Sequence, residues 1–371
     1  MKRSIVGLIL ISTIFVTSCG DDETGGDTSG FDRKGMLTDL SDNIIIPSYD
    51  SLHKKVQLMN NDLSAFVASP DLANLVSARA SFEGAYHAWQ RISYLEIGPA
   101  FNVLLRSSVN SFPADKNSIE VNITNENYDL TALSSQDEKG FPAIGYLLYG
   151  IGSTDTEIIE KYTTDANAAN RLTYLEKVYT EIGIKISEVT AAWKTDGENY
   201  RQTFIDQDGT DIGSSIGLLI NEVTRYIEAD VRDEKIGIPL GKRSQGIPIP
   251  AEVEAGYSEL SISLATENLK ALHQFYLGKG SNGDQVSFYD YLIALNAKYN
   301  GEVLADVIAS QFEKSIAAVN AIPEPYGSTV VNNPAAAEQA YTELQKLTIL
   351  FKVDMSSALG VLITYQDNDG D

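Results

Sequence analysis

Apolar residues recur at intervals of three and four along most of this 371-residue chain. Such spacing places them on one face of an α-helix that is directed at a core. Three of these faces are Phe82, Ala85, Tyr86, Trp89, Ile92 and Leu95; Ile212, Ile216, Leu219, Val223 and Tyr226; and Tyr341, Leu344, Leu347, Phe351, Met355 and Leu362. Strand-like alternation is confined to short pieces such as residues 118–123. The sequence therefore predicts an all-α fold.

Stretches rich in proline, glycine and polar residues interrupt the helical pattern. They are Pro70 with Asp71, residues 107–129, residues 206–211, residues 237–250 and residues 322–334. The helices between them are long, so antiparallel packing into bundles is the simplest arrangement. The chain beyond residue 30 is longer than a single core usually reaches. We therefore expect two helical bundles packed side by side, residues 31–205 and 206–371, with a ligand groove between them.

The first 30 residues have the pattern of an exported lipoprotein. A short basic head precedes an apolar stretch over residues 5–16, which is too short to span a bilayer and has the length of a signal-peptide core. Residues 16–19 match the lipobox that bacterial lipoprotein signal peptidase cleaves. We expect residues 1–18 to be a signal peptide and residues 19–30 to be a lipidated Cys19 followed by a flexible tether. The alternative is an ordinary secretory signal with an incidental cysteine.

The residues that follow Cys19 bear on the location of the protein. Asp21, Asp22 and Glu23 resemble the acidic surface-export signal of Bacteroidetes lipoproteins. The expected location is therefore the cell envelope, as an outer-membrane lipoprotein compatible with surface exposure. The expected contact with the membrane is the lipid anchor.

The net charge restricts the binding partners of the protein, and the cysteine content restricts its crosslinks and metal ligands. The chain has 28 Lys and Arg against 51 Asp and Glu, a net charge of -23, which disfavours nucleic acid and anionic membrane surfaces as partners. The charge is compatible with cationic partners, and equally with an ordinary acidic soluble surface. Cys19 is the only cysteine, so the folded part has neither a disulfide nor a thiolate metal ligand.

Histidine is scarce, and the common catalytic motifs are missing from the sequence. The three histidines are His53, His87 and His273, and no HExxH, GxSxG, phosphate-binding glycine loop or Cys/His cluster is present. Glu83 and His87 are four residues apart and could supply two ligands to one metal ion. The alternative is a surface pair with no ligand.

Two further segments carry candidate binding groups. Residues 367–371, which include Asp367 and Asp369, have the acidic spacing of the start of a calcium loop, but the distal Glu of an EF-hand is missing. They could form a partial oxygen-ligand site, or cap and pair within the fold. The loop 237–244 carries Lys242 and Arg243 and could hold an anion or carboxylate. The alternative is a structural loop whose cations neutralise nearby carboxylates.

Several segments, in chain order, resemble the imelysin-like family, which is also classed as peptidase family M75 and is linked to iron-regulated envelope proteins. They are residues 88–91 with 96–99, 110–113, 139–141, 146–150, 237–244 and 353–371. The resemblance implies two helical domains with the functional site at their interface, an extracytoplasmic location and an association with iron uptake. The groove residues that it implies are Trp89, Arg91, Glu96, Gly140, Pro142, Gly145, Arg243, Ser244, Asp367 and Asp369.

The family's hallmark is GxHxxE, whose His and Glu lie at the functional site. Residues 140–145 align with this motif, with Pro142 at the histidine position and Gly145 at the glutamate position. Neither can ligate a metal through its side chain or transfer a proton. The iron or other divalent cation that the resemblance implies would therefore lack two of its ligands here. Pro142 is tolerated in the first turn of a helix, so the fold can persist.

These observations lead to one expected function and two alternatives. We expect a lipid-anchored, non-enzymatic binding or accessory protein that uses the groove between its bundles for a small ligand, a metal or an envelope protein. The first alternative is a metal-dependent peptidase of the M75 type, with replacement ligands such as Glu83, His87 or Asp369 near Pro142 and Gly145. The second is a purely structural envelope protein, which would lack a pocket lined by polar residues.

Overall fold

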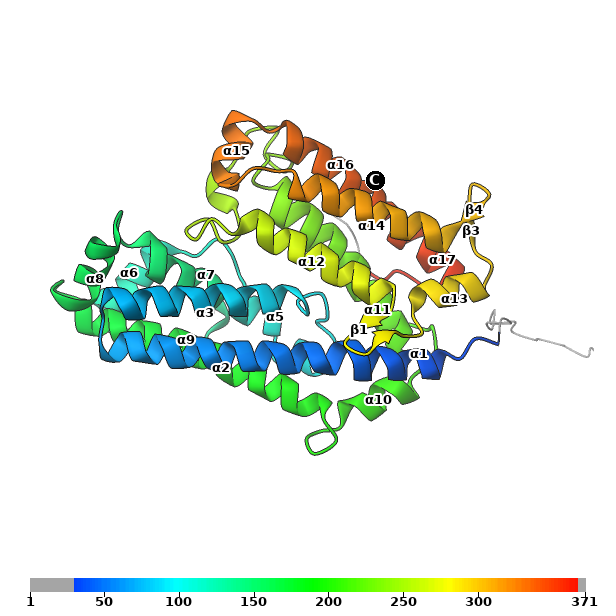
Figure 1. Cartoon of the computed structure of the whole chain (residues 1–371), viewed down its shortest axis with the longest axis horizontal. Helices are drawn as coiled ribbons and strands as arrows, with labels where there is room; N and C mark the ends of the chain where they lie inside the picture. The colour runs from blue at the N-terminus through cyan, green and yellow to red at the C-terminus, as the bar shows by residue number, and fades with distance from the viewer. Residues whose placement is uncertain (1–29, 366–371) are drawn as a thin grey trace, which may run out of the picture.

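The computed structural model describes residues 30–365, and it is built almost entirely of helices (Figure 1). The strands in this part of the chain form two short antiparallel hairpins, β1 with β2 and β3 with β4. The predicted all-α fold is therefore confirmed. The predicted signal peptide, Cys19 and the acidic residues Asp367 and Asp369 lie outside the described residues.

The elements of the first half are α1 (Arg33–Leu40), η1 (Ser41–Ile45), α2 (Ile46–Ala68), α3 (Leu72–Gln90), α4 (Pro99–Asn102), α5 (Leu105–Val109), α6 (Lys116–Thr124), η2 (Leu133–Glu138), α7 (Gly140–Gly145), η3 (Tyr146–Gly150), α8 (Asp155–Thr163), α9 (Ala168–Trp193) and α10 (Tyr200–Asp206). The elements of the second half are α11 (Ser215–Arg225), η4 (Tyr226–Gly237), η5 (Pro250–Glu252), α12 (Ser261–Tyr276), β1 (Lys279–Gly280), β2 (Gly283–Asp284), α13 (Phe288–Ala294), β3 (Lys298–Tyr299), β4 (Glu302–Val303), α14 (Leu304–Asn320), α15 (Tyr326–Asn332), α16 (Ala335–Ile349), η6 (Leu350–Met355) and α17 (Ser356–Leu359).

The first half is organised around α2, which packs on both α3 and α9. The apolar face of α2 comprises Tyr49, Leu52, Val56, Met59, Leu63 and Phe66, all buried at helical spacing. After α2 ends, Asp71 caps α3 by accepting a hydrogen bond from the backbone N–H of Asn74. The predicted break at Pro70 and Asp71 is thus confirmed.

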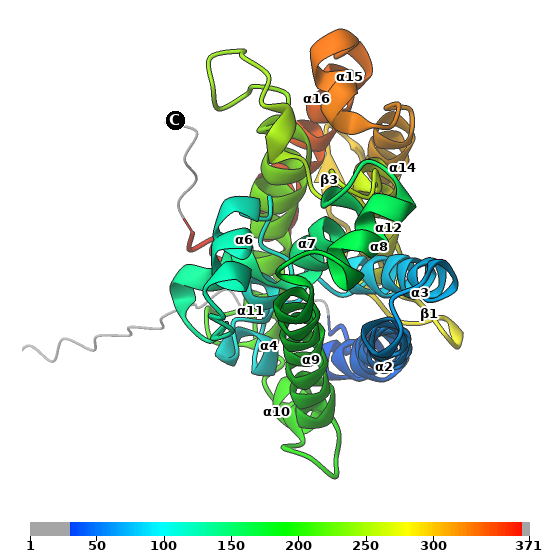
Figure 2. The same cartoon turned by 90° about the vertical axis from the view of Figure 1, so that its left-hand side faces the viewer.

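The second half contains a group of long helices in which α14 packs on α12 and α16, and α16 packs on η4. Figure 1 shows this group in yellow and orange above the blue and green helices of the first half, and Figure 2 shows the same two groups from the side. The two groups meet where α12 packs on α3. No helix of the described residues is long and apolar enough to cross a membrane.

Three details differ from the sequence-based expectation. Residues 118–123, which have strand-like alternation, lie in α6, where Asp115 caps the helix and Ile119 and Ile123 are buried one helical turn apart. Ile212 precedes α11 and is 55% exposed, and Leu362 follows α17 and is 65% exposed, so neither belongs to the predicted helix face. The predicted breaker at residues 322–334 contains the short helix α15.

A buried ion pair in the second half is hydrogen-bonded to side chains of the first half. The Lys235 ammonium in η4 donates to the Glu254 carboxylate, and the two side chains are 3% and 1% exposed. The same carboxylate accepts hydrogen bonds from Gln90 at 3.0 Å and from Asn110 at 2.9 Å, and Tyr86 donates to it at 3.3 Å. Because every polar group around it is paired, this network can be buried without leaving an uncompensated charge.

Replacement of Glu254 by alanine should destabilise the protein strongly. The change leaves the Lys235 ammonium buried without its carboxylate, which costs about 3–5 kcal/mol in free energy of unfolding. Urea denaturation followed by circular dichroism measures this loss. The matched control is Asp206→Ala, which removes the exposed ion pair with Lys34 and should have a much smaller effect. Equal midpoints for the two variants would contradict a supporting role for the buried pair.

Candidate functional site

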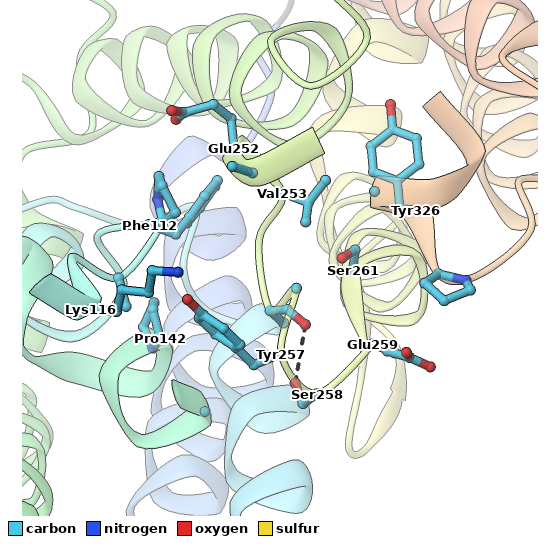
Figure 3. A pocket seen from close by; sticks show the side chains of 18 of the residues that line it. Phe112, Lys116, Pro142, Glu252, Val253, Tyr257, Ser258, Glu259, Ser261 and Tyr326 are labelled. Atoms are coloured by element: carbon cyan, nitrogen blue, oxygen red, sulfur yellow. Dashed lines mark hydrogen bonds between the residues drawn. The ribbon is translucent and has the colours of Figure 1, made fainter. Parts of the chain in front are cut away.

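A cavity of about 780 Å³ lies where the two halves meet (Figure 3). Ten aromatic or proline residues contribute to its wall: Phe82, Tyr86, Phe112, Pro113, Phe141 and Pro142 come from the first half, and Pro250, Tyr257, Pro325 and Tyr326 from the second. Cavities of roughly 300–1,000 Å³ with mainly apolar walls and a few polar groups are typical small-molecule sites. A cavity of this kind therefore lies between the halves, where a ligand groove is expected.

Helix α7 supplies the wall at the position of the hallmark motif. Gly140 begins the helix with a φ of +78°, and a Cβ there would lie 2.4 Å from the carbonyl oxygen of Val109. A glycine is therefore needed at this close approach. The ring of Phe141 stacks on that of Tyr86 with centroids 4.8 Å apart, which fixes α7 against α3.

Pro142 and Gly145 both line the cavity. They are three residues apart, so they share one face of α7. A Cβ at Gly145 would make only an ordinary contact, 3.5 Å from Cζ of Phe82. The cavity thus extends to the two positions where the family motif has His and Glu, and in this chain neither position presents a donor atom.

The remaining polar groups of the cavity do not form a metal site. Its charged side chains are Asp115, Lys116, Asp137, Glu252 and Glu259. Asp115 is occupied in capping α6, and the Lys116 ammonium points into the space between Phe112 and Tyr257 (Figure 3). Among the described residues, no group of three or more His, Cys, Asp or Glu side chains is placed to hold a metal ion. The described residues of this cavity therefore do not fit the metal ion that the family resemblance implies.

Glu83 and His87, the pair considered as replacement ligands, lie on α3 outside the cavity lining. Glu83 accepts a hydrogen bond of 2.9 Å from the Tyr149 hydroxyl. Burial lowers the pKa of His87, so its ring favours the neutral form. These contacts match the alternative in which the pair holds no metal.

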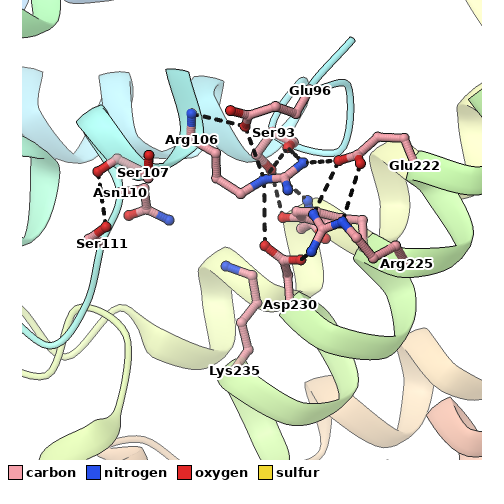
Figure 4. A network of polar contacts seen from close by, with 12 residues as sticks. Ser93, Glu96, Arg106, Ser107, Asn110, Ser111, Glu222, Arg225, Asp230 and Lys235 are labelled. Atoms are coloured by element: carbon pink, nitrogen blue, oxygen red, sulfur yellow. Dashed lines mark hydrogen bonds and ion pairs between the residues drawn. The ribbon is translucent and has the colours of Figure 1, made fainter. Parts of the chain in front are cut away.

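A second cavity, of about 500 Å³, adjoins the first, and Phe112 and Glu252 line both. It has more charged residues than the first, eight against five (Figure 4). Its charged lining consists of Glu96, Arg106, Glu222, Arg225, Asp230, Glu234, Lys235 and Glu252. The two cavities therefore differ in chemistry while sharing one boundary.

Arg106 is at the centre of the charged cavity, with its side chain 15% exposed. Its guanidinium donates to the Ser93 carbonyl at 2.8 and 3.0 Å and to the Glu222 carboxylate. It lies 3.5 Å from an Asp230 oxygen and 3.6 Å from a Glu96 oxygen, and it covers the Tyr226 ring. One cation thus holds three carboxylates.

Two carboxyl groups on this cavity have perturbed acidities. Burial raises the pKa of Glu96 to about 7, although the Arg106 guanidinium opposes the shift. Partial burial and the Asp230 carboxylate raise the pKa of Glu234 to about 7 as well. Perturbed groups of this kind cluster at functional sites more often than elsewhere.

Several charged residues of the second cavity belong to the segment η4, and the sequence pattern does not mark them as site residues. This segment is π-helical, with hydrogen bonds joining residues i and i+5, so residues four and five apart reach one side. Tyr226, Asp230, Glu234 and Lys235 line the charged cavity as a result. The sequence feature that could have indicated these site residues is the dense run of charges at residues 228–235, which directly follows an amphipathic helix.

The remaining groove residues predicted in the first half have separate locations. Glu96 lines the charged cavity, whereas Trp89 is 1% exposed and belongs to the core. Arg91 is exposed and pairs with Glu267. Of the residues predicted to line a single groove, Pro142 and Gly145 line the larger cavity and Glu96 lines the adjoining one.

The loop at residues 237–244 lines neither cavity except at Ile238. Arg243 pairs with Asp233, and Lys242 pairs with Glu338. The Ser244 hydroxyl donates to the Ile247 carbonyl. These contacts fit the alternative in which the loop cations neutralise nearby carboxylates.

Comparisons with known proteins agree on one family. The sequence model described as imelysin, peptidase M75, matches residues 45–351. Iron-regulated protein A of Synechococcus elongatus is 22% identical over 335 residues, which cover 88% of this chain and 84% of that protein.

Two solved structures have a similar fold. One, described as an iron-regulated protein A precursor from Parabacteroides distasonis, superposes with a TM-score of 0.71 at 20% identity, covering 87% of this chain and 94% of that one. The other is an imelysin-like protein from Psychrobacter arcticum, with a TM-score of 0.69 at 17% identity, covering 90% and 97%.

Proposed function

The chain belongs to the imelysin family, and from this premise we propose that it is a non-enzymatic binding protein that takes an organic ligand in the cavity between its two halves. The observation that carries this proposal is the position of Pro142 and Gly145. Both residues face the cavity at the motif positions of His and Glu, and neither offers a metal ligand or a proton.

The shape and lining of the cavity support binding over catalysis. A wall that combines aromatic and proline side chains with several polar groups recognises a ligand through apolar contact and directed interactions. Hydrolysis of a peptide would require a metal-bound water or an activated side-chain nucleophile. The described residues around this cavity bring together neither set of groups.

Binding should depend on the space next to Gly145. We expect the neutral apolar dye Nile red to bind the wild-type protein at one site, and Gly145→Trp to weaken binding at least about tenfold by filling the cavity. Gly145→Ala is the matched control, since its Cβ fits beside Phe82 and leaves the cavity open. Fluorescence titration measures the affinities, and unchanged binding by Gly145→Trp would contradict the cavity as the site.

The alternative function is a metal-dependent peptidase of the M75 type with replacement ligands. Calorimetric titration of Zn²⁺, and of Fe²⁺ without oxygen, into the metal-free protein separates the two functions. We expect weak or no binding by the wild type, and a gain of affinity when Pro142→His and Gly145→Glu are combined, because both side chains would enter the cavity from one helix face. Stoichiometric binding by the wild type, on the order of micromolar or tighter and unaffected by the two changes, would favour the peptidase.

We further propose that the protein is held in the cell envelope by a lipid on Cys19, as an outer-membrane lipoprotein in an organism of the Bacteroidetes type. The support is the sequence of residues 1–30. Relatives named iron-regulated protein A also support an accessory role connected with iron supply. In this arrangement the tether would connect the anchor to α1.

Replacement of Cys19 by alanine should abolish lipidation, because the thiol is the atom that receives the lipid. We expect cells that express the wild type to incorporate labelled palmitate into the protein, and cells that express Cys19→Ala to leave the precursor unprocessed or released. Ser18→Ala, which keeps a small residue before the cysteine, is the matched control. Equal labelling of wild type and Cys19→Ala would reject the anchor.

A further inference from the structure

The two cavities provide adjoining compartments of different chemistry. The larger has six aromatic residues in its wall and five charged ones, the smaller has eight charged residues, and Phe112 and Glu252 belong to the walls of both. These two side chains therefore form part of the boundary between the cavities. Figure 3 shows Phe112 and Glu252 together on one side of the larger cavity.

The charged cavity has an excess of carboxylates. Five line it, against three cations: Arg106, Arg225 and Lys235. The Lys235 ammonium is already neutralised by Glu254, a carboxylate outside the lining. Arg225 is held between Glu222 and Asp230, at 3.2 and 3.0 Å. The cations present are therefore all engaged, and negative charge remains.

Two of the carboxylates have no direct partner among the described residues. The side chains of Glu234 and Glu252 make no hydrogen bond or ion pair within residues 30–365; Glu234 is exposed and Glu252 half-buried. Asp230 is 7% exposed, and its Oδ2 accepts no hydrogen bond from this part of the chain, although it lies 3.0 Å from an Arg225 nitrogen. The Arg225 guanidinium compensates the charge of Asp230, whose Oδ2 can still accept a hydrogen bond from a donor that enters the cavity.

We propose that the ligand is an organic cation with an apolar or aromatic body, which places its amine or guanidinium group in the charged cavity near Glu234 and Glu252 and its body in the aromatic cavity. The inference rests on the proposed function, since it specifies the ligand class of the same site. The ligand's cation supplies the charge and donors that the second cavity lacks. Its body removes apolar surface from water beside Phe112 and Tyr257.

An organic cation fits these residues better than a metal ion does. A bare divalent ion needs several ligands converging on one point, and the described residues provide no such group. An amine or guanidinium needs only nearby carboxylates, and aromatic faces add cation–π attraction. Phe112 already takes part in such a contact, because the Lys235 ammonium lies 5.6 Å from the centre of its ring.

The acidity of Glu234 supports this assignment. Its raised pKa reflects partial burial and the Asp230 carboxylate, and the nearby cations Lys235, Arg106 and Arg225 do not fully offset them. A bound cation would favour the ionised form of Glu234, so binding near pH 7 should release protons. Calorimetry in two buffers with different ionisation enthalpies measures this release.

The test compares two dyes of opposite charge on the full-length protein. Thioflavin T is cationic and aromatic, and 1-anilinonaphthalene-8-sulfonate is anionic and aromatic. We expect the wild type to bind thioflavin T more tightly, and Glu234→Gln combined with Glu252→Gln to weaken that binding about tenfold without weakening the anionic dye. Added salt should lower the affinity for thioflavin T.

The matched control is Glu188→Gln combined with Glu313→Gln, which changes the net charge equally at exposed positions that line neither cavity. It should leave both dyes unaffected. Thermal melting checks that each variant is folded. An equal loss of thioflavin T binding in the control pair would attribute the preference to overall charge and would overturn the inference.

The outcomes separate the inference from the proposed function. If Nile red binds and depends on Gly145, but the two charged dyes bind equally and Glu234→Gln with Glu252→Gln changes neither, the cavity binds ligands and the cationic class is wrong. If neither Nile red nor either charged dye binds the wild type, the proposed function fails and the inference fails with it.

Discussion

The carboxylate of Glu254 is the group on which the arrangement of both cavities depends. It is 1% exposed, and it receives donors from α3, from the segment just before Phe112, and from η4. Of these segments, α3 lines the larger cavity, η4 lines the charged cavity, and the segment with Phe112 lines both. Because removal of a carboxylate from a buried network leaves its donors unpaired, the positions of the segments are coupled energetically as well as geometrically.

The hallmark motif has separable structural and chemical roles in this fold. Gly140 is needed because any Cβ would collide with the Val109 carbonyl, so the first position of the motif serves the backbone. Pro142 and Gly145 instead line the cavity, and a Cβ at Gly145 would make only an ordinary contact with Phe82. The chain therefore keeps the family's fold while its cavity wall lacks the family's histidine and glutamate. An aromatic cavity remains.

The helices could be predicted from sequence because each buries a continuous apolar stripe, as α2 does from Tyr49 to Phe66. The short segment 118–123 is ambiguous in sequence, since a few alternating residues fit both the helical and the strand period. The structure shows a helix there, capped by Asp115. At the candidate site, Pro142 and Gly145 were found through the motif. Arg106 and Glu234 could not be found, because a charge in a helical pattern is usually a solvated one, and only the tertiary structure shows what surrounds it.

Most of the buried charges of η4 are tolerated because they form ion pairs. A π-helical segment is wider than an α-helix, and it brings Tyr226, Asp230 and Glu234 to one side, where Arg106 and Arg225 approach from different elements. Most of the charges on this segment find a partner, as Arg232 does with Asp233 and Lys235 does with Glu254. Glu234 does not, within the residues described. Glu234 is exposed at the cavity, so its carboxylate is available to a cation that arrives from outside the chain.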